Sequence, residues 1–297
     1  DVLGHLVEVV TGSTFEDFMQ DQIFQPLGMA SSSYTTLPET LKGYNLVFGF
    51  PVHLSDTTRP PSPSGGLVTT AEDMAHLVRM YLDDGAPLLN PEIASLALTP
   101  PFDPSDGYGM GWYTSSVDDV EFLAHGGDIN SFHADMALLP EAGYGAVLLY
   151  NTNNLILNFS AFPAALNGLA LVLSGAEAPS GGISIRVIGL FILAWMLWTL
   201  YAGIRKAMKA GAWAGEARGW KPLRRVLSLV ANLLPALVLL FLPQIILLIS
   251  GRSASRSLLF SYIPDVLLVL GAAAVLGIVQ FILRVRALRT HSSLAQG

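Results

Sequence analysis

Apolar residues recur at helical spacing in several stretches of the first 175 positions. A stripe over 2–10 predicts a helix that stops at Gly12. Capping boxes at 13–16 and 70–73 predict the starts of two further helices, and Asn90 followed by Pro91 predicts the start of a fourth. The helical pattern returns over 155–173, whereas residues 31–68, rich in Ser, Thr, Pro and Gly, are predicted to form a long loop.

Between these helical stretches the pattern changes to short apolar or alternating runs, which are typical of strands. The runs cover 109–113, 120–124, 132–139 and 144–150, and turn-forming residues separate them at 115–119, 126–128 and 140–143. Consecutive strands joined by short turns predict an antiparallel meander. Residues 1–173 are therefore expected to form a mixed α/β domain, and the small residues of 174–185 a linker.

The remaining part of the chain, 186–297, contains three long apolar runs without charged residues. They cover about 187–204, 226–249 and 266–283, each near the ~20 residues that a helix needs to cross a bilayer. We expect an all-α, three-helix transmembrane region in contact with the lipid bilayer. Pro235 and Pro243 are expected to bend the second helix, and Asp265 is expected to stay hydrated at the outer end of the third.

Composition supports this division. Of 297 residues, 52% are hydrophobic and only 13% are charged, against a typical ~25% charged in soluble proteins. The mean hydropathy of +0.49 likewise indicates that part of the chain has lipid as its solvent. The absence of cysteine excludes disulfides, thiol catalysis and Cys-ligated metal sites.

Charge is distributed unevenly along the chain. The residues before Arg186 include 21 acids and 3 bases, a net charge of −18, whereas the rest has 13 bases and 2 acids, a net charge of +11. The acidic part would repel phosphates, so nucleic acid is not an expected partner. The bases gather after the first and third apolar runs, which places those segments in the cytoplasm. We therefore expect a multi-pass protein of the cell membrane, with its acidic domain extracytoplasmic and its C-terminus cytoplasmic.

The sharpest candidate for chemistry is His125-Gly126-Gly127, at the end of a predicted strand. Two glycines there would let a ligand approach the strand edge, and a histidine beside it could move a proton. A strand end followed by an ordinary turn is the alternative interpretation. Ser64-Gly65-Gly66 has the same two interpretations, as a ligand-facing loop or a plain one. The other histidines lack metal-ligand spacing and are interpreted as surface or core residues, and neither a metal nor a cofactor is expected.

Several segments together carry a family resemblance. In order, the chain resembles the β-lactamase-related serine hydrolases, which comprise the class C β-lactamases, D-Ala-D-Ala carboxypeptidases and related esterases, at residues 3–15, 23–29, 64–75, 108–112, 125–127 and 148–153. The resemblance implies an α/β fold: the C-terminal half of a β-lactamase/DD-peptidase-like domain, with an antiparallel sheet flanked by helices. Together with the three apolar runs, it implies a membrane-anchored serine hydrolase that acts through an acyl-enzyme on a small peptide, an ester or a β-lactam.

The resemblance also assigns roles to individual residues. His125 would be catalytic, and the backbone N–H of Asp128 would donate to the oxyanion. The substrate-binding residues would be Gly126, Gly127, Ser64, Gly65, Gly66 and Tyr108. Ser131 departs from the family pattern, since relatives often have glycine there.

Two family motifs are missing from the chain. None of its lysines has a serine three residues before it, so there is no Ser-x-x-Lys, and the Tyr-x-Asn motif is absent as well. We expect the chain to begin just after Tyr-x-Asn in a longer protein, and to be inactive alone. The alternative is a catalytically inactive, membrane-tethered module that binds cell-wall peptide or a similar ligand. A transporter or sensor with an outer domain is a further, less favoured, interpretation.

Overall fold

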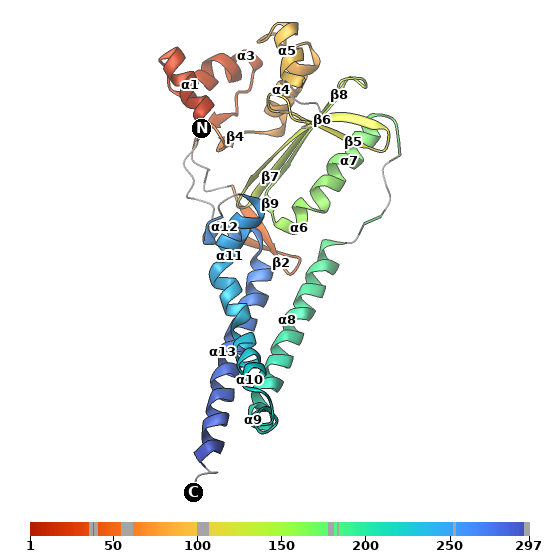
Figure 1. Ribbon diagram of the computed structural model, residues 1–297. Coiled ribbons are helices and arrows are strands. Elements are labelled where there is room, and N and C mark those ends of the chain that lie inside the picture. The colour runs from red at the N-terminus through yellow and green to blue at the C-terminus, as the bar shows by residue number, and fades with distance from the viewer. Residues whose placement is uncertain are drawn as a thin grey trace. The chain divides into compact units, whose positions relative to one another are not determined.

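The computed structural model describes residues 1–35, 38, 41–54, 62–99, 107–177, 181–182, 184–251 and 254–293 (Figure 1). The chain forms two compact units. The first comprises Asp1–Asn45 and Pro51–Gly182, and the second comprises Leu46–Phe50 and Ile183–Gly297. Four positions of the predicted linker, residues 178–180 and 183, lie outside the described residues.

Short helices open the first unit. They are α1 (Val2–Thr11), α2 (Phe15–Met19), a π-helical turn η1 (Gln20–Phe24) and α3 (Gln25–Leu27). The predicted stop of the first helix is confirmed, because Gly12 has the left-handed φ of 72° that glycine tolerates. The predicted capping box at 13–16 is wrong by one residue. Thr14 caps α2 instead, since its hydroxyl accepts a hydrogen bond from the N–H of Asp17 at 3.1 Å.

Helices α4 (Ala71–Leu82) and α5 (Pro91–Leu98) begin where the capping residues predict. The Thr70 hydroxyl accepts from the N–H of Asp73 at 3.1 Å, and the Asn90 side chain accepts from the N–H of Ile93 at 2.8 Å. Both starts could be predicted because a cap uses only neighbours in the sequence.

The predicted long loop over 31–68 is wrong in part, because it contains four short strands. Strand β1 (Ser33–Tyr34) pairs with β4 (Leu67–Val68), and β2 (Gly43–Val47) lies between β3 (Phe50–Leu54) and β9 (Thr152–Asn153). The β2–β9 pairing is parallel, with Asn45 opposite Asn153. The β1–β4 and β2–β9 pairings join residues far apart in the sequence and leave no local pattern to detect. Strand β3, by contrast, follows its partner β2 directly along the chain.

The main sheet is the predicted antiparallel meander. Its order is β5 (Tyr113–Val117), β6 (Val120–Ile129), β7 (Phe132–Leu139) and β8 (Tyr144–Tyr150), so that β5 and β8 are its outer strands among the described residues. The last two strands match their predicted bounds. The first run, predicted over 109–113, is wrong, because β5 begins at Tyr113 and covers much of the expected 115–119 turn.

Two local features explain the differences in β5 and β6. Val117 pairs with Val120, so only Asp118 and Asp119 form the turn, and Asp118 adopts the positive φ of 49° that such tight hairpins require. The turn expected over 126–128 is also wrong. β6 continues through its glycines, because the ladder with β7 supplies partners as far as Ile129.

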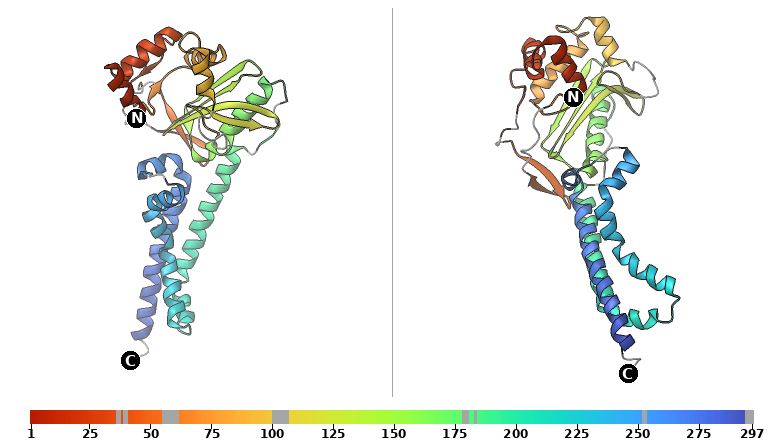
Figure 2. Two further views of the ribbon diagram at one scale, coloured as in Figure 1. Left: turned by 45° about the horizontal axis from the view of Figure 1, so that its top comes forward. Right: turned by 60° about the vertical axis from the view of Figure 1, so that its left-hand side comes forward.

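Helices cover both faces of this sheet (Figures 1 and 2). On one face Ala137 and Leu139 of β7 pack with Leu166 and Ala170 of α7 (Ala161–Leu173). On the other face Leu138 packs with Val78 of α4 and with Trp112. Alternate residues of β7 thus enter two cores, which is the architecture implied by the resemblance.

The helix predicted over 155–173 is interrupted. It forms α6 (Leu155–Asn158) and α7, with Phe159 and Ser160 between them. Pro163 explains the break, because a proline lacks the N–H that a continuous helix would bond to residue 159 and clashes with that carbonyl. In the first turn of α7 the same proline is tolerated.

Apart from Leu46–Phe50, the described residues of the second unit lie mainly in helices. Its helices are α8 (Ile185–Met208), α9 (Ala210–Ala217), α10 (Pro222–Val230), the 3₁₀ turn η3 (Ala231–Leu233), α11 (Leu234–Ser250), α12 (Arg256–Tyr262) and α13 (Pro264–Ser293). By length and composition, four helical segments of the described chain could cross a membrane: Leu155–Leu173, Ile185–Met208, Pro222–Ile249 and Pro264–Thr290. The last three contain the predicted runs, and the first is α6 with α7.

Asp265 was expected to be hydrated, but the structure shows it buried. Asp265 is 2% exposed, and its carboxylate accepts a hydrogen bond from the backbone N–H of Phe48 at 2.9 Å, within the second unit. The carboxylate satisfies a backbone donor of the Leu46–Phe50 segment, a partner that hydropathy alone does not reveal.

Candidate active site

Among the described residues, the stretch His125–Ile129 of β6 has a strand partner on one side only. β6 pairs with β5 from Val120 to Ala124 and with β7 from Leu123 to Ile129. No described strand pairs with the other side of His125–Ile129, and Gly126, Gly127 and Asp128 are exposed. Because alternate backbone groups of a strand point to each edge, this open edge presents peptide donors and acceptors to a ligand.

His125 lies at the start of the open edge among aromatic side chains. Its ring stacks on that of Tyr113 with centroids 6.0 Å apart, and the Tyr108 ring lies 6.3 Å away. Burial in this environment lowers the pKa of His125. The imidazole is therefore neutral at pH 7 and able to accept a proton.

The loop that carries Tyr108 is held firmly beside His125. Trp112 is 3% exposed and packs edge-on against Tyr81, and its carbonyl accepts from the N–H of Gly109 at 2.7 Å. The structure thus brings predicted residue Tyr108 to His125. The structure also places Tyr113 beside His125. Sequence reasoning missed Tyr113 because it put this residue at the end of a strand, whereas β5 begins there.

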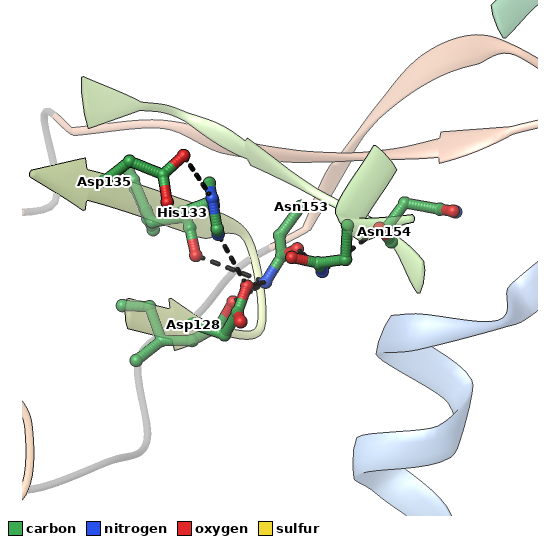
Figure 3. Close-up of polar contacts among 8 residues, drawn as sticks. Asp128, His133, Asp135, Asn153 and Asn154 are labelled. Atoms are coloured by element: carbon green, nitrogen blue, oxygen red, sulfur yellow. Dashed lines mark hydrogen bonds and ion pairs between the residues drawn. The ribbon is translucent and has the colours of Figure 1, made fainter. Parts of the chain in front are cut away.

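Asp128 takes part in a polar cluster through its side chain (Figure 3). Its Oδ1 lies 2.8 Å from Nδ1 of His133, and Oδ2 of Asp135 lies 2.9 Å from Nε2 of the same ring. The His133 ring stacks on the ring of Phe162 of α7, with the centroids 4.0 Å apart. His133 is 7% exposed. Both ring nitrogens of His133 are therefore bound to carboxylates.

The cluster fixes the charge of its members. Burial by itself would lower the pKa of His133, but the hydrogen bonds to Asp128 and Asp135, with the charges of these carboxylates, raise it to about 9. Burial would also raise the pKa of Asp128, but the hydrogen bonds and charge of His133 and the hydrogen bond from Asn153 hold it below its usual value. At pH 7 the cluster is an imidazolium between two carboxylates.

Asn153 of β9 closes the turn between β6 and β7. Its Nδ2 lies 2.7 Å from the carbonyl oxygen of Ile129, 3.2 Å from that of Phe132, and 3.0 Å from Oδ1 of Asp128. Asn158 in turn donates to the Asn153 side chain at 2.8 Å. Through these hydrogen bonds Asn153 fixes the position of the end of the open edge.

Sequence reasoning missed the contacts of His133, Asp135 and Asn153 in this cluster. A signal was present for the first two, because the strict alternation of 132–139 places His133 and Asp135 on the same face as Ala137 and Leu139. Two polar residues on a buried face require partners. Placing those partners requires the register of β6 against β7, which the pattern does not reveal.

The predicted Ser64-Gly65-Gly66 segment lies beside the N-terminal residue of the chain. It forms a tight turn in which Ser62 and Gly65 pair, and the N–H of Ser64 donates to Oδ1 of Asp1 at 3.2 Å. The turn is thereby held to the N-terminal end of α1. Within the described ranges no group of three or more His, Cys, Asp or Glu side chains is arranged to hold a metal ion.

Comparison with known proteins agrees with this architecture. A family model described as Beta-lactamase matches residues 1–162. Penicillin-binding protein 4 of Amycolatopsis lactamdurans is 29% identical over 176 residues, which cover 50% of this chain and 45% of that protein. The unguisins hydrolase ungD′ of Aspergillus campestris is 27% identical over 168 residues, covering 51% of this chain and 32% of that protein. The chain thus spans less than half the length of either relative.

Solved structures of a penicillin-binding protein homologue and of an amidase are also similar to this chain. The octameric penicillin-binding protein homologue from Pyrococcus abyssi is 21% identical, with a TM-score of 0.48 over 59% of this chain and 41% of that one. D-amino acid amidase from Ochrobactrum anthropi is 22% identical, with a TM-score of 0.43 over 51% and 49% of the two chains. The family model matches more than half of the residues, and on that match the chain belongs to the Beta-lactamase family.

Proposed function

We propose that this chain supplies one wall of the active site of a serine hydrolase that works through an acyl-enzyme. The observation that carries the proposal is the open edge of β6 at His125–Ile129, in a chain of this family. A substrate carbonyl placed along that edge would meet backbone N–H groups, with a neutral imidazole beside it. The nucleophilic serine and its lysine would come from outside this chain, because no Ser-x-x-Lys occurs in it.

Each residue of the wall has a proposed part in the reaction. The serine oxygen attacks the substrate carbonyl, and the N–H of Asp128 donates to the oxygen that becomes negative. The lysine takes the proton of the attacking serine, and His125 receives this proton and passes it to the departing atom as the bond to the leaving group breaks. Water then attacks the acyl-enzyme, which releases the acid and restores the serine. A pKa lowered by burial suits the neutral imidazole of His125 to accept the proton. Gly126 and Gly127 let the substrate approach the backbone, and Tyr108 packs on its apolar part. Ser64, Gly65 and Gly66 are proposed to bind the substrate from the turn near Asp1.

The proposed substrate is a small peptide, an ester or a β-lactam. One relative is named as a penicillin-binding protein, and penicillin is a β-lactam, while another is named as a hydrolase. No cofactor is included, because an acyl-enzyme route needs only a nucleophile, a base and oxyanion donors.

We further propose that α8, α10 with α11, and α13 cross the cell membrane, with the hydrolase domain extracytoplasmic. Helix α7 is not included, because Phe162, Leu166, Ala170 and Leu171 are buried in its own unit. The bases between the first two proposed spans and after the third favour a cytoplasmic position for those segments.

Covalent labelling tests the proposed function. The full-length protein, produced from its gene, should label at one serine with a fluorophosphonate and should hydrolyse a p-nitrophenyl ester, whereas the chain described above should not label alone. Absence of both reactions in the full-length protein would instead favour the inactive binding module. Labelling of a serine within this chain would contradict the assignment of the nucleophile.

A further inference from the structure

The cluster of Asp128, His133 and Asp135 lies against Gly126–Asp128, the part of β6 that is proposed to bind the oxyanion. In the β6–β7 register His133 is opposite Asp128, and Asp135 is opposite Gly126. A Cβ atom added to Gly126 would lie 3.0 Å from Oδ1 of Asp135, so this carboxylate packs against the strand backbone. The bridge through His133 thus reaches from one end of the Gly126–Asp128 stretch to the other.

We infer that His133 is a positioning residue of this site: by joining Asp128 to Asp135, it holds Gly126–Asp128 extended and aims the Asp128 N–H at the substrate. The inference rests on the proposed function, because the N–H needs aiming only if the edge binds a carbonyl oxygen.

The composition of the edge explains why such a brace is needed. Gly126 and Gly127 have no side chains, and glycine has more backbone freedom than any other residue. No described strand supports the stretch from its other side. Asp128 therefore has the only side chain in Gly126–Asp128 that can fix the position of this stretch.

The geometry of the cluster suits a brace. Hydrogen bonds between an imidazolium and carboxylates are stronger than neutral ones, and here they measure 2.8 and 2.9 Å. Phe162 keeps the ring in one plane, since the two rings are 6° from parallel. Asn153 fixes the following turn through Ile129 and Phe132.

Two amide substitutions separate the two halves of the bridge in the full-length protein. In His133→Asn the amide nitrogen lies near the place of Nδ1 and can still donate to Asp128. In His133→Gln it lies near the place of Nε2 and can donate only to Asp135. Each variant loses the positive charge of the ring and one of its two hydrogen bonds, so both should lose a similar amount of thermal stability.

Positioning predicts that the two variants differ in catalysis. For a p-nitrophenyl ester, His133→Gln should lower kcat by about 10- to 100-fold with KM within about two-fold, because removing an oxyanion donor outright costs ~10²–10³. His133→Asn should stay within about three-fold. A boronic acid that forms a tetrahedral adduct should bind His133→Gln weaker by the same factor as kcat falls.

The matched control is Leu166→Ala, which removes a core contact on α7 one helical turn after Phe162 and leaves the three members of the bridge unchanged. Below its melting temperature it should keep wild-type kcat. Equal kcat in both His133 variants, or kcat that follows Tm across all three variants, would overturn the inference while the wild type remains active. An inactive wild type would overturn the proposed function and the inference with it.

Discussion

At the scale of single residues, two histidines on neighbouring strands show how surroundings set charge. His125 lies among aromatic rings, and burial lowers its pKa. His133 is buried too, but two carboxylates at hydrogen-bonding distance raise its pKa to about 9. One imidazole is thus available for proton transfer at pH 7, whereas the other is a fixed cation in the fold.

Replacing His125 should affect activity far more than stability. In the full-length protein, His125→Ala should lower kcat/KM by ~10²–10⁴, the usual contribution of a positioned acid–base group. The melting temperature should change little, because the ring is only half-buried at the strand edge. The control is His76→Ala, on an exposed position of α4. Activity that is unchanged, or lost only with unfolding, would contradict the proposed role.

His133 should make the stability of the first unit depend on alkaline pH. The titratable groups that face it are Asp128 on β6, Asp135 on β7 and the Tyr150 hydroxyl on β8, and α7 contributes the apolar Phe162. The folded pKa of about 9 lies above the unfolded value of ~6.5, so the stabilisation is complete below ~6.5 and is lost as pH rises through about 9.

Limited proteolysis in urea can follow this loss. The unfolding midpoint of the wild type should fall from pH 7 to pH 9.5, and that of His133→Gln should be lower at pH 7 and nearly flat over the same range. Parallel curves for the two proteins would show that another group is responsible.

At the scale of elements, helix α4 depends on its first residue. Thr70→Ala removes the acceptor for the N–H of Asp73 and should lower the free energy of unfolding by ~1 kcal/mol, the usual cost of losing a cap. Thr70→Ser keeps a hydroxyl and should retain most of it. Urea titration of both variants measures the difference, and equal stability of the two would show that the cap contributes nothing.

Elements built from local signals could be predicted from the sequence, and those built from distant pairings could not. Caps mark the starts of α4 and α5, and alternation between turns marks β7 and β8, so these two starts and the bounds of these two strands were predicted closely. The β2–β9 pair joins residues far apart in sequence. The extension of β6 through Gly126 and Gly127 depends on β7, whereas glycines alone favour a turn.

The same limit applies to the candidate site. His125 and its glycines are adjacent in sequence and could be singled out as a motif. The contacts of Asp128 with His133 and Asn153 exist only once three strands are in register. The alternation of β7 could predict that His133 is buried, but not which carboxylates surround it.

At the scale of the whole molecule, the charge difference between the two parts of the chain predicts a topology. The chain has no cysteine, so single cysteines can be labelled without background. Ala212→Cys, exposed on α9, should be shielded from a membrane-impermeant thiol reagent in intact cells, because its flanking bases favour the cytoplasm. Ala176→Cys, also exposed, should react. The reverse pattern would invert the proposed orientation.

Strand β8, which is outermost in the main sheet among the described residues, has a consequence for handling the protein. Residues Tyr144–Tyr150 include no charged residue and no proline. Residues of these kinds usually prevent an outer strand from pairing with the same strand of another molecule. Tyr144 and Leu149 are 54% and 41% exposed. We expect the chain, when produced alone, to aggregate edge to edge through this strand, and Leu149→Lys to keep it dispersed in light-scattering measurements.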